Sequence, residues 1–186
     1  MTCNCATEEQ QQTPKEIHQF GPVKSNEIAL IAGIHPLNCR DGELQPGAFD
    51  HKQLKRAEPM QNVSCCRRDH SSPEEVISQI VEPLRTKQSD RRLENVYLAV
   101  AEKIRDIQVE GTEVAAFCVI DCGLPEFPSH AAISYSDRIR GDDKFWEKAT
   151  QKNDGRSVKI AAIAELTNLF REGVCKLDEA FPRAEQ

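Results

Sequence analysis

The apolar residues of this chain come in short runs, separated by proline, glycine and charged residues. Two such runs, 28–34 and 113–120, contain several β-branched side chains and have the length of strands. No apolar run reaches the ~18 residues that a membrane-spanning helix needs. The pattern therefore predicts a folded domain with short strands and no spanning segment.

The clearest helix signal is Ser72-Pro73-Glu74-Glu75. Serine at the N-cap, proline at the first helical position and glutamate three residues after the serine form a capping box. The apolar residues that follow have helical spacing and form one stripe, which we expect to pack on a core. They are Val76, Ile77, Ile80, Val81 and Leu84. Pro83 is expected to stop or kink this helix.

Other segments give weaker signals. A second, long amphipathic helix is predicted from Ile160 to near Phe181, with an apolar stripe that extends to Val174. Segment 130–135 alternates and is expected to pair with 113–120 as an antiparallel hairpin. Segment 62–66 fits a short strand, 96–100 fits a strand or a helix equally well, and 103–107 favours a helix.

Together these signals predict a single α+β domain over residues 27–182. We expect a small, mostly antiparallel sheet, packed by two or three amphipathic helices. Residues 1–26 include the polar run Glu-Glu-Gln-Gln-Gln-Gln and predict a mobile N-terminal extension, with Phe20 and Val23 able to dock at its end.

Charge and cysteine content restrict the class of partner and the compartment. The chain has 24 basic and 30 acidic residues, for a net charge of −6. Because nucleic-acid-binding proteins usually carry a basic surface, this acidic balance argues against a nucleic-acid partner. The start of the chain lacks a basic region followed by an apolar stretch, so we expect no secretory signal. The eight cysteines are then expected to be reduced thiols in a cytoplasmic protein.

The best catalytic candidates are Asp121, Cys122 and His130. Asp121 and Cys122 follow a predicted strand, and hairpin pairing brings His130 close to them. A thiolate beside an imidazole is an activated nucleophile, and Asp121 would orient the ring. The alternative, which we favour, is that Cys122 packs in the core, Asp121 caps the loop and His130 forms local hydrogen bonds.

The sequence predicts no metal site. Cys118 and Cys122 have a spacing found in zinc sites, but on an extended strand they lie about 13 Å apart, at roughly 3.3 Å per residue. Two thiolates on one zinc ion must be within ~4 Å of each other. Cys65 and Cys66 with His70, helped by Cys39 or by the pair Cys3 and Cys5, remain an alternative, although neighbouring strand residues point to opposite faces.

An anion pocket is a further candidate. Arg67 follows a predicted strand and lies close in sequence to His70, so these residues, with His35 or His130, would bind a small anion. Several basic residues cluster locally and would form a cationic face if the fold brings them together. They are Lys52, Lys55, Arg56, Arg67, Arg68, Arg85, Lys87, Arg91 and Arg92.

We expect a small intracellular protein that acts as a non-catalytic interaction or accessory module with a protein partner. No common nucleotide-binding, metallopeptidase or hydrolase motif occurs, and no cofactor is predicted. The first alternative is a hydrolase or acyltransferase that uses Cys122 and His130. The second is a phosphate- or nucleic-acid-binding protein that uses the cationic face. For the module, the apolar stripe from Ile160 to Val174 should be partly exposed.

Overall fold

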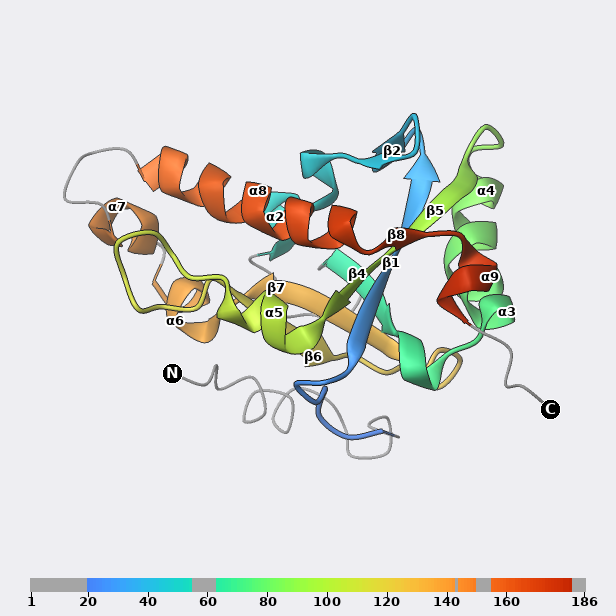
Figure 1. Ribbon diagram of the computed structural model, residues 1–186, viewed down its shortest axis with the longest axis horizontal. Helices are drawn as coiled ribbons and strands as arrows, with labels where there is room; N and C mark the ends of the chain where they lie inside the picture. Colours follow the sequence, from blue (N-terminus) through green and yellow to red (C-terminus); the bar gives the residue numbers. More distant parts are fainter. Residues whose placement is uncertain (1–19, 55–62, 143, 150–154, 182–186) are drawn as a thin grey trace.

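The computed structural model describes residues 20–54, 63–142, 144–149 and 155–181 (Figure 1). Six strands form one sheet in the order β6–β7–β4–β1–β5–β8, and every neighbouring pair is antiparallel. The strands are β1 (Ile28–His35), β4 (Val63–Arg67), β5 (Arg92–Val100), β6 (Phe117–Asp121), β7 (His130–Tyr135) and β8 (Val174–Cys175). The prediction of an α+β domain with an antiparallel sheet is confirmed.

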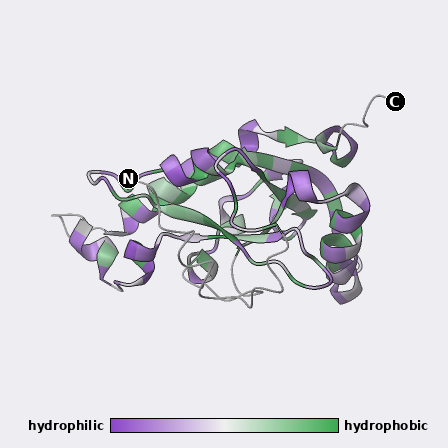
Figure 2. Ribbon diagram, turned by 90° about the horizontal axis from the view of Figure 1, so that it is seen from below, coloured by the Kyte–Doolittle hydropathy of each residue, from purple (hydrophilic) through white to green (hydrophobic). Residues whose placement is uncertain are grey.

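Helices and one short hairpin surround this sheet. The hairpin consists of β2 (Cys39–Arg40) and β3 (Glu43–Leu44). The helices are η1 (Pro46–Ala48), α2 (His51–Leu54), η2 (Arg68–His70), α3 (Pro73–Val76), η3 (Ile77–Val81), α4 (Glu82–Lys87), α5 (Ala101–Asp106), α6 (Asp137–Arg140), α7 (Phe145–Ala149), α8 (Gly155–Glu172) and α9 (Leu177–Ala180). Figure 2 shows mostly hydrophobic strands between helices that alternate between hydrophilic and hydrophobic residues.

The central strand β1 is buried on both faces, because alternate residues of a strand point in opposite directions. Ala29 and Ile31 belong to the main core, which also contains Phe170 of α8. Ile34 packs instead with Val81 of η3. The sheet is therefore the middle layer, with α8 on one face and the helix formed by α3, η3 and α4 on the other.

That second helix begins as predicted. Ser72 Oγ accepts a hydrogen bond from the Glu75 N–H at 3.2 Å. Of the two outcomes predicted for Pro83, the first is wrong: Pro83 does not end the helix, which continues to Lys87. The preceding turn is a π-helix, in which the Glu82 N–H donates to Ile77 O. The wider turn accommodates a residue that lacks an N–H and whose ring crowds the preceding turn of an α-helix.

The structure also assigns the segments whose sequence signals were ambiguous. Segment 96–100 belongs to strand β5, and α5 covers most of 103–107. The predicted hairpin forms between β6 and β7, with Val119 opposite Ile133. The prediction of one C-terminal helix to near Phe181 is wrong: α8 ends at Glu172, Val174 lies on β8, and α9 follows as a separate helix.

Part of the predicted N-terminal extension lies on the domain. Val23 is 5% exposed, and its carbonyl accepts a hydrogen bond from Arg105 Nη2 at 2.8 Å. The Ser25 carbonyl accepts from the Glu102 N–H. Residues 1–19 lie outside the described residues.

Most of the described cysteines are free thiols, namely Cys39, Cys65, Cys66, Cys122 and Cys175. Cys118 on β6 is disulfide-bonded, so the expectation of reduced thiols is wrong for this residue. Within the part of the chain that the structure describes, no helix combines the length and the apolar composition needed to cross a bilayer.

Candidate functional site

Five of the six predicted site residues lie at one end of the sheet. In an antiparallel sheet the ends of β4 and β6 meet the beginnings of β1 and β7, and the register follows this rule. Arg67 pairs with Ala29, Cys66 with His130, and Asp121 with Ala131. The fold therefore brings together Arg67, His70, Asp121, Cys122 and His130.

Arg67 is the centre of this end of the sheet and is 1% exposed. Its Nε and Nη2 donate to the two carboxylate oxygens of Glu27 at 2.6 and 2.7 Å. Its Nη1 donates to Gly21 O at 2.6 Å and lies 3.8 Å from Asp121 Oδ2. Bidentate pairing of this kind is a strong, charge-assisted interaction. Two carboxylates thus face one guanidinium, which leaves little positive charge to attract an anion.

Two further residues complete this arrangement: Glu27, which was not predicted, and Phe20, which was expected only to dock on the domain. Glu27 precedes β1 and is 5% exposed. Burial opposes its ionisation, but hydrogen bonds from Arg67 and from the Lys24 N–H outweigh burial and lower the pKa of Glu27. Phe20 stacks on His70 with a centroid distance of 4.2 Å, and its ring lies 5.7 Å from Arg67 Cζ. We refer to Phe20, Glu27, Arg67, His70 and Asp121 as the Arg67 cluster.

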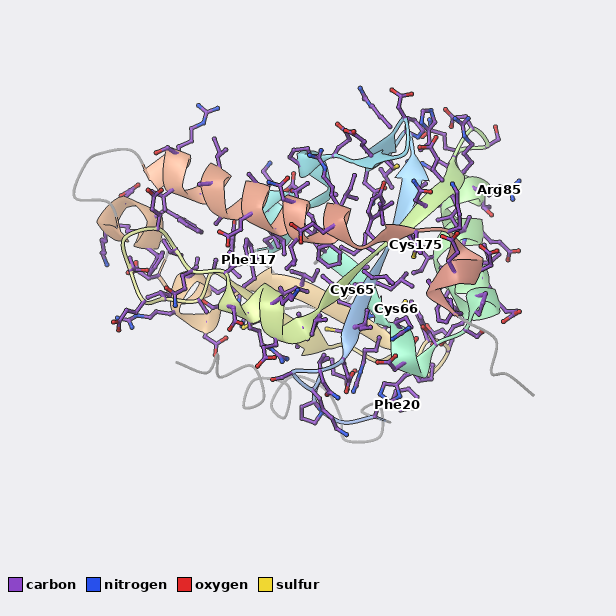
Figure 3. The ribbon with its side chains drawn as sticks, viewed as in Figure 1. Phe20, Cys65, Cys66, Arg85, Phe117 and Cys175 are labelled. Carbon is purple, nitrogen blue, oxygen red and sulfur yellow. The ribbon has the colours of Figure 1, made fainter. Side chains whose placement is uncertain are left out.

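His70 is the most accessible ionisable group of the Arg67 cluster. Its side chain is 31% exposed, and Nε2 lies 3.8 Å from Glu27 Oε1. Phe20, which covers one side of the ring, appears at the lower end of the molecule in Figure 3. His70 therefore adds a charge-dependent contact to Glu27 at the surface of an otherwise buried group.

Cys122 and His130 are adjacent, as predicted, and two hydrogen bonds link the main chain of Cys122 to the main chain and the ring of His130. The Cys122 N–H donates to His130 O at 3.1 Å, and His130 Nδ1 donates to Cys122 O at 2.9 Å. The carbonyl can only accept, so Nδ1 carries the proton and is not a base for the thiol. Burial lowers the pKa of His130, against the opposing effects of the Cys122 carbonyl and Asp121.

Access to this pair is also limited. Cys122 is 3% exposed and His130 is 4% exposed, and Phe127 lies against the imidazole at 5.3 Å. Asp121 Oδ1 accepts from the Gly123 N–H at 3.2 Å, which stabilises the turn after β6. This geometry fixes the turn and the ring, and it presents neither group to a substrate in solution.

His35 lies at the opposite end of β1. It follows Ala29, the partner of Arg67, by six residues, which is about 20 Å along a strand. Its Nδ1 lies 3.4 Å from Glu94 Oε1, so it belongs to a different group of polar residues. The structure therefore does not bring His35 together with Arg67 and His70.

Around Glu94, polar contacts hold the β2–β3 hairpin on β5. Glu94 Oε2 accepts from the Gly42 N–H at 3.0 Å, and Cys39 Sγ donates to it at 3.3 Å. Tyr97 OH donates to Gly42 O at 2.7 Å. Burial raises the pKa of the Cys39 thiol, so this cysteine stays protonated at neutral pH. A Cβ on Gly33 would lie 2.5 Å from the Tyr97 ring, which explains a glycine inside β1.

The candidate metal ligands do not assemble. Cys65 packs in the main core, whereas Cys66 packs on the other face with Val76 (Figure 3). Burial raises the pKa of both thiols, that of Cys66 to about 12. Among the described residues, no group of three or more histidine, cysteine or acidic side chains has a geometry that fits a metal ion. Cys3 and Cys5 lie outside this part of the chain.

The predicted cationic face is divided. Arg67 is buried and neutralised, and Arg68 pairs with Asp69 at 2.6 Å. Lys55 and Arg56 lie outside the described residues. The exposed basic residues Arg85, Lys87 and Arg92 remain near the connection from α4 to β5, where Figure 3 labels Arg85.

A groove of about 680 Å³ lies elsewhere, between the loop before β6 and helices α6 and α7. Its lining includes Val114, Phe145, Asp137, Arg138 and Lys148. Burial raises the pKa of Asp137, although Arg140 donates to it at 2.9 Å. The groove carries both charge signs and contains none of the predicted site residues.

The apolar stripe of the C-terminal segment is partly buried and partly exposed. Leu166 and Phe170 are fully buried, whereas Ile160 is 54% exposed and Val174 is 46% exposed. Among the described residues, the only other large hydrophobic side chain with such exposure is Leu37, in the turn after β1. We refer to the exposed side of α8 together with β8 as the α8–β8 surface.

Comparisons of the whole chain with family models, with curated proteins and with solved structures found no match.

Proposed function

We propose that this chain is a non-catalytic interaction or accessory module that binds a protein partner through the α8–β8 surface. The observation that carries the proposal is the exposure of Ile160 and Val174 on a stripe whose other large members are buried or partly buried. Apolar side chains exposed singly are common, but two of the three such residues in the described part belong to this one segment.

The polar groups of the Arg67 cluster and the neighbouring His130 support the same proposal, because they are already paired within the fold. The Arg67 guanidinium donates to Glu27 and Gly21, and His130 donates to the Cys122 carbonyl. Groups that already satisfy one another inside the fold stabilise it and contribute little to binding a ligand. The geometry therefore favours the module over a cysteine hydrolase or an anion-binding site.

The test compares matched surface variants in affinity capture from the cells that make the protein. Ile160→Asp and Val174→Asp place a charge on the α8–β8 surface, and Leu37→Asp places the same charge on the third exposed apolar position. We expect quantitative mass spectrometry to find a protein that the wild type and Leu37→Asp capture and that the other two variants lose. Equal capture by all four proteins, or equal loss with Leu37→Asp, would contradict the proposal.

For the compartment, we propose the cytoplasm, on the basis of five free thiols in the described residues. The disulfide at Cys118 argues in the other direction. Counting the alkylated cysteines of protein isolated under acid quench decides whether the chain is reduced or carries the disulfide. A cytoplasmic chain is expected to be alkylated at all eight cysteines.

A further inference from the structure

We infer that the partner of the α8–β8 surface is a second copy of this chain, joined by antiparallel pairing of β8 with β8. The inference rests on the proposed function, since it names the occupant of that surface. It is carried by the main-chain geometry of β8 and by the charges on either side of it.

The two edges of the sheet differ. At the β6 edge, Arg105 Nη2 donates to Val119 O at 3.1 Å, and α5 packs beside the strand. All five residues of β6 are buried. At the other edge, β8 follows α8 directly (Figure 1), and Val174 is exposed. An uncovered edge strand offers main-chain donors and acceptors to another strand.

The register identifies which main-chain groups of β8 face outward. The Leu98 N–H donates to Gly173 O, Tyr97 lies opposite Val174, and Val96 lies opposite Cys175. In an antiparallel ladder, hydrogen-bonded pairs alternate with pairs whose N–H and C=O groups point away from each other. The Val174 N–H and C=O therefore point away from β5, toward the open edge.

A second copy satisfies both groups at once. With Val174 opposite Val174 of the second copy, each residue donates its N–H to the carbonyl of the other, which is the two-fold geometry of a hydrogen-bonded antiparallel pair. In this register the end of α8, which carries Glu172, lies beside Lys176 of the second copy, and the reverse contact is repeated. Opposite charges that lie near each other favour this register over others.

Lys176 is placed for that role. Its Nζ donates to Glu94 O at 3.0 Å and to Asn95 Oδ1 at 2.6 Å, which fixes the ammonium beside the edge and leaves its third N–H for a carboxylate. Glu172, at the end of α8, is exposed. The chain thus supplies one positive and one negative group on the two sides of Val174.

Gly173 and Cys175 make this register measurable. A Cβ on Gly173 would lie 2.0 Å from Leu98 O, so glycine is required there by the chain itself. In the paired register each Cys175 faces Gly173 of the other copy, and the two Cys175 side chains lie diagonally across the pair, about 7–8 Å apart. No side chain stands between them.

The strand is short, so we expect a dimer that dissociates on dilution. Sedimentation velocity of the full chain from ~1 μM to ~1 mM covers the range expected of weak association. Val174→Pro removes the outward N–H and places the proline ring at the open edge, and Val174→Asp places two carboxylates opposite each other. We expect each to weaken dimerisation more than tenfold, whereas Val174→Thr keeps the main chain and the dimer. Circular dichroism checks that each variant is folded.

Cross-linking supplies a second readout on the wild-type chain. A bis-maleimide with a reach of ~8 Å matches the spacing of diagonal neighbours in a strand pair, so we expect it to join Cys175 of one copy to Cys175 of the other. Mass spectrometry locates the linked peptides. A chain that stays monomeric at ~1 mM, or a dimer that keeps its stability in Val174→Pro and forms no Cys175 link, would overturn the inference. If the chain is monomeric but the Ile160→Asp variant loses a captured protein, the second copy is wrong and the proposed function stands.

Discussion

The Arg67 cluster and the α8–β8 surface are opposite in their use of polar groups. In the cluster, ionisable side chains are buried and directed at one another, as in the bidentate pair of Arg67 and Glu27. On the α8–β8 surface, Ile160 and Val174 are exposed, and β8 turns main-chain groups outward. The comparison teaches that residue types often associated with catalysis can be paired with one another inside a fold, whereas here a valine and an isoleucine are exposed on the surface where we propose that a partner binds.

The largest effect in this comparison is expected from removing the buried cation. Arg67→Met removes the buried cation that faces the carboxylates of Glu27 and Asp121, and breaking such a pair costs about 3–5 kcal/mol of unfolding free energy. Urea unfolding measures the loss. Arg85→Met, which removes an exposed arginine, is the matched control and should change stability by less than about 0.5 kcal/mol. Equal effects in the two variants would show that the Arg67 cluster does not stabilise the fold.

A smaller loss is expected where β8 joins the sheet. In Gly173→Ala the new methyl group meets the Leu98 carbonyl at 2.0 Å, and overpacking of this kind costs about 1–3 kcal/mol. Gly47→Ala is the control, because nothing lies within 4 Å of its Cβ position. Thermal unfolding compares the two. A neutral Gly173→Ala would mean that β8 is not held closely on β5.

The Arg67 cluster and its neighbour His130 also predict the direction of pH dependence. The pKa of His130 is lowered by burial, so the unfolded chain binds the proton more readily, and stability is lost as the pH falls below ~6.5. Glu27, with its lowered pKa, adds a further loss as the pH falls below ~4.3. For the wild type, the urea concentration at the midpoint of unfolding should therefore decrease as the pH is lowered from about 7.5 to about 5.5.

His130→Gln tests the assignment of the first step. This variant removes the titrating ring, so its urea midpoints should change less over the same pH range, even if it is less stable throughout. An unchanged slope would mean that another group causes the pH dependence.

Much of the fold follows from local signals, because they act between near neighbours. The Ser72 cap, strands β1 and β7, and the hairpin of β6 with β7 were all predictable from propensity and spacing. The helix through Pro83 was not, because its continuation depends on a π-turn that packs Val81 against the sheet.

The site was predictable only in part, for a related reason. Hairpin proximity correctly placed Cys122 beside His130. Glu27 and Arg67 are 40 residues apart, and only the pairing of β1 with β4 brings them together. A single glutamate before a strand gives no signal of its own. His35 was grouped with Arg67 because topology was unknown, and the two lie at opposite ends of β1.

The smallest expected effect concerns the rate of thiol labelling. Among the described free cysteines, only Cys175 is not buried, so alkylation of the native protein should modify it before Cys122, Cys65 and Cys66. His130→Ala should leave the native labelling order unchanged, as judged by mass spectrometry. A fast reaction at Cys122 with a low apparent pKa, lost in His130→Ala, would instead indicate an activated nucleophile.

The most direct test of the contrast between the two regions is one binding measurement on two variants. Association of the full chain, with itself or with a captured protein, is measured for Val174→Asp and for Cys122→Ser with the wild type beside them. The account predicts that Val174→Asp loses association and that Cys122→Ser retains it. Association retained in Val174→Asp and lost in Cys122→Ser would contradict the assignment of the α8–β8 surface as the functional region.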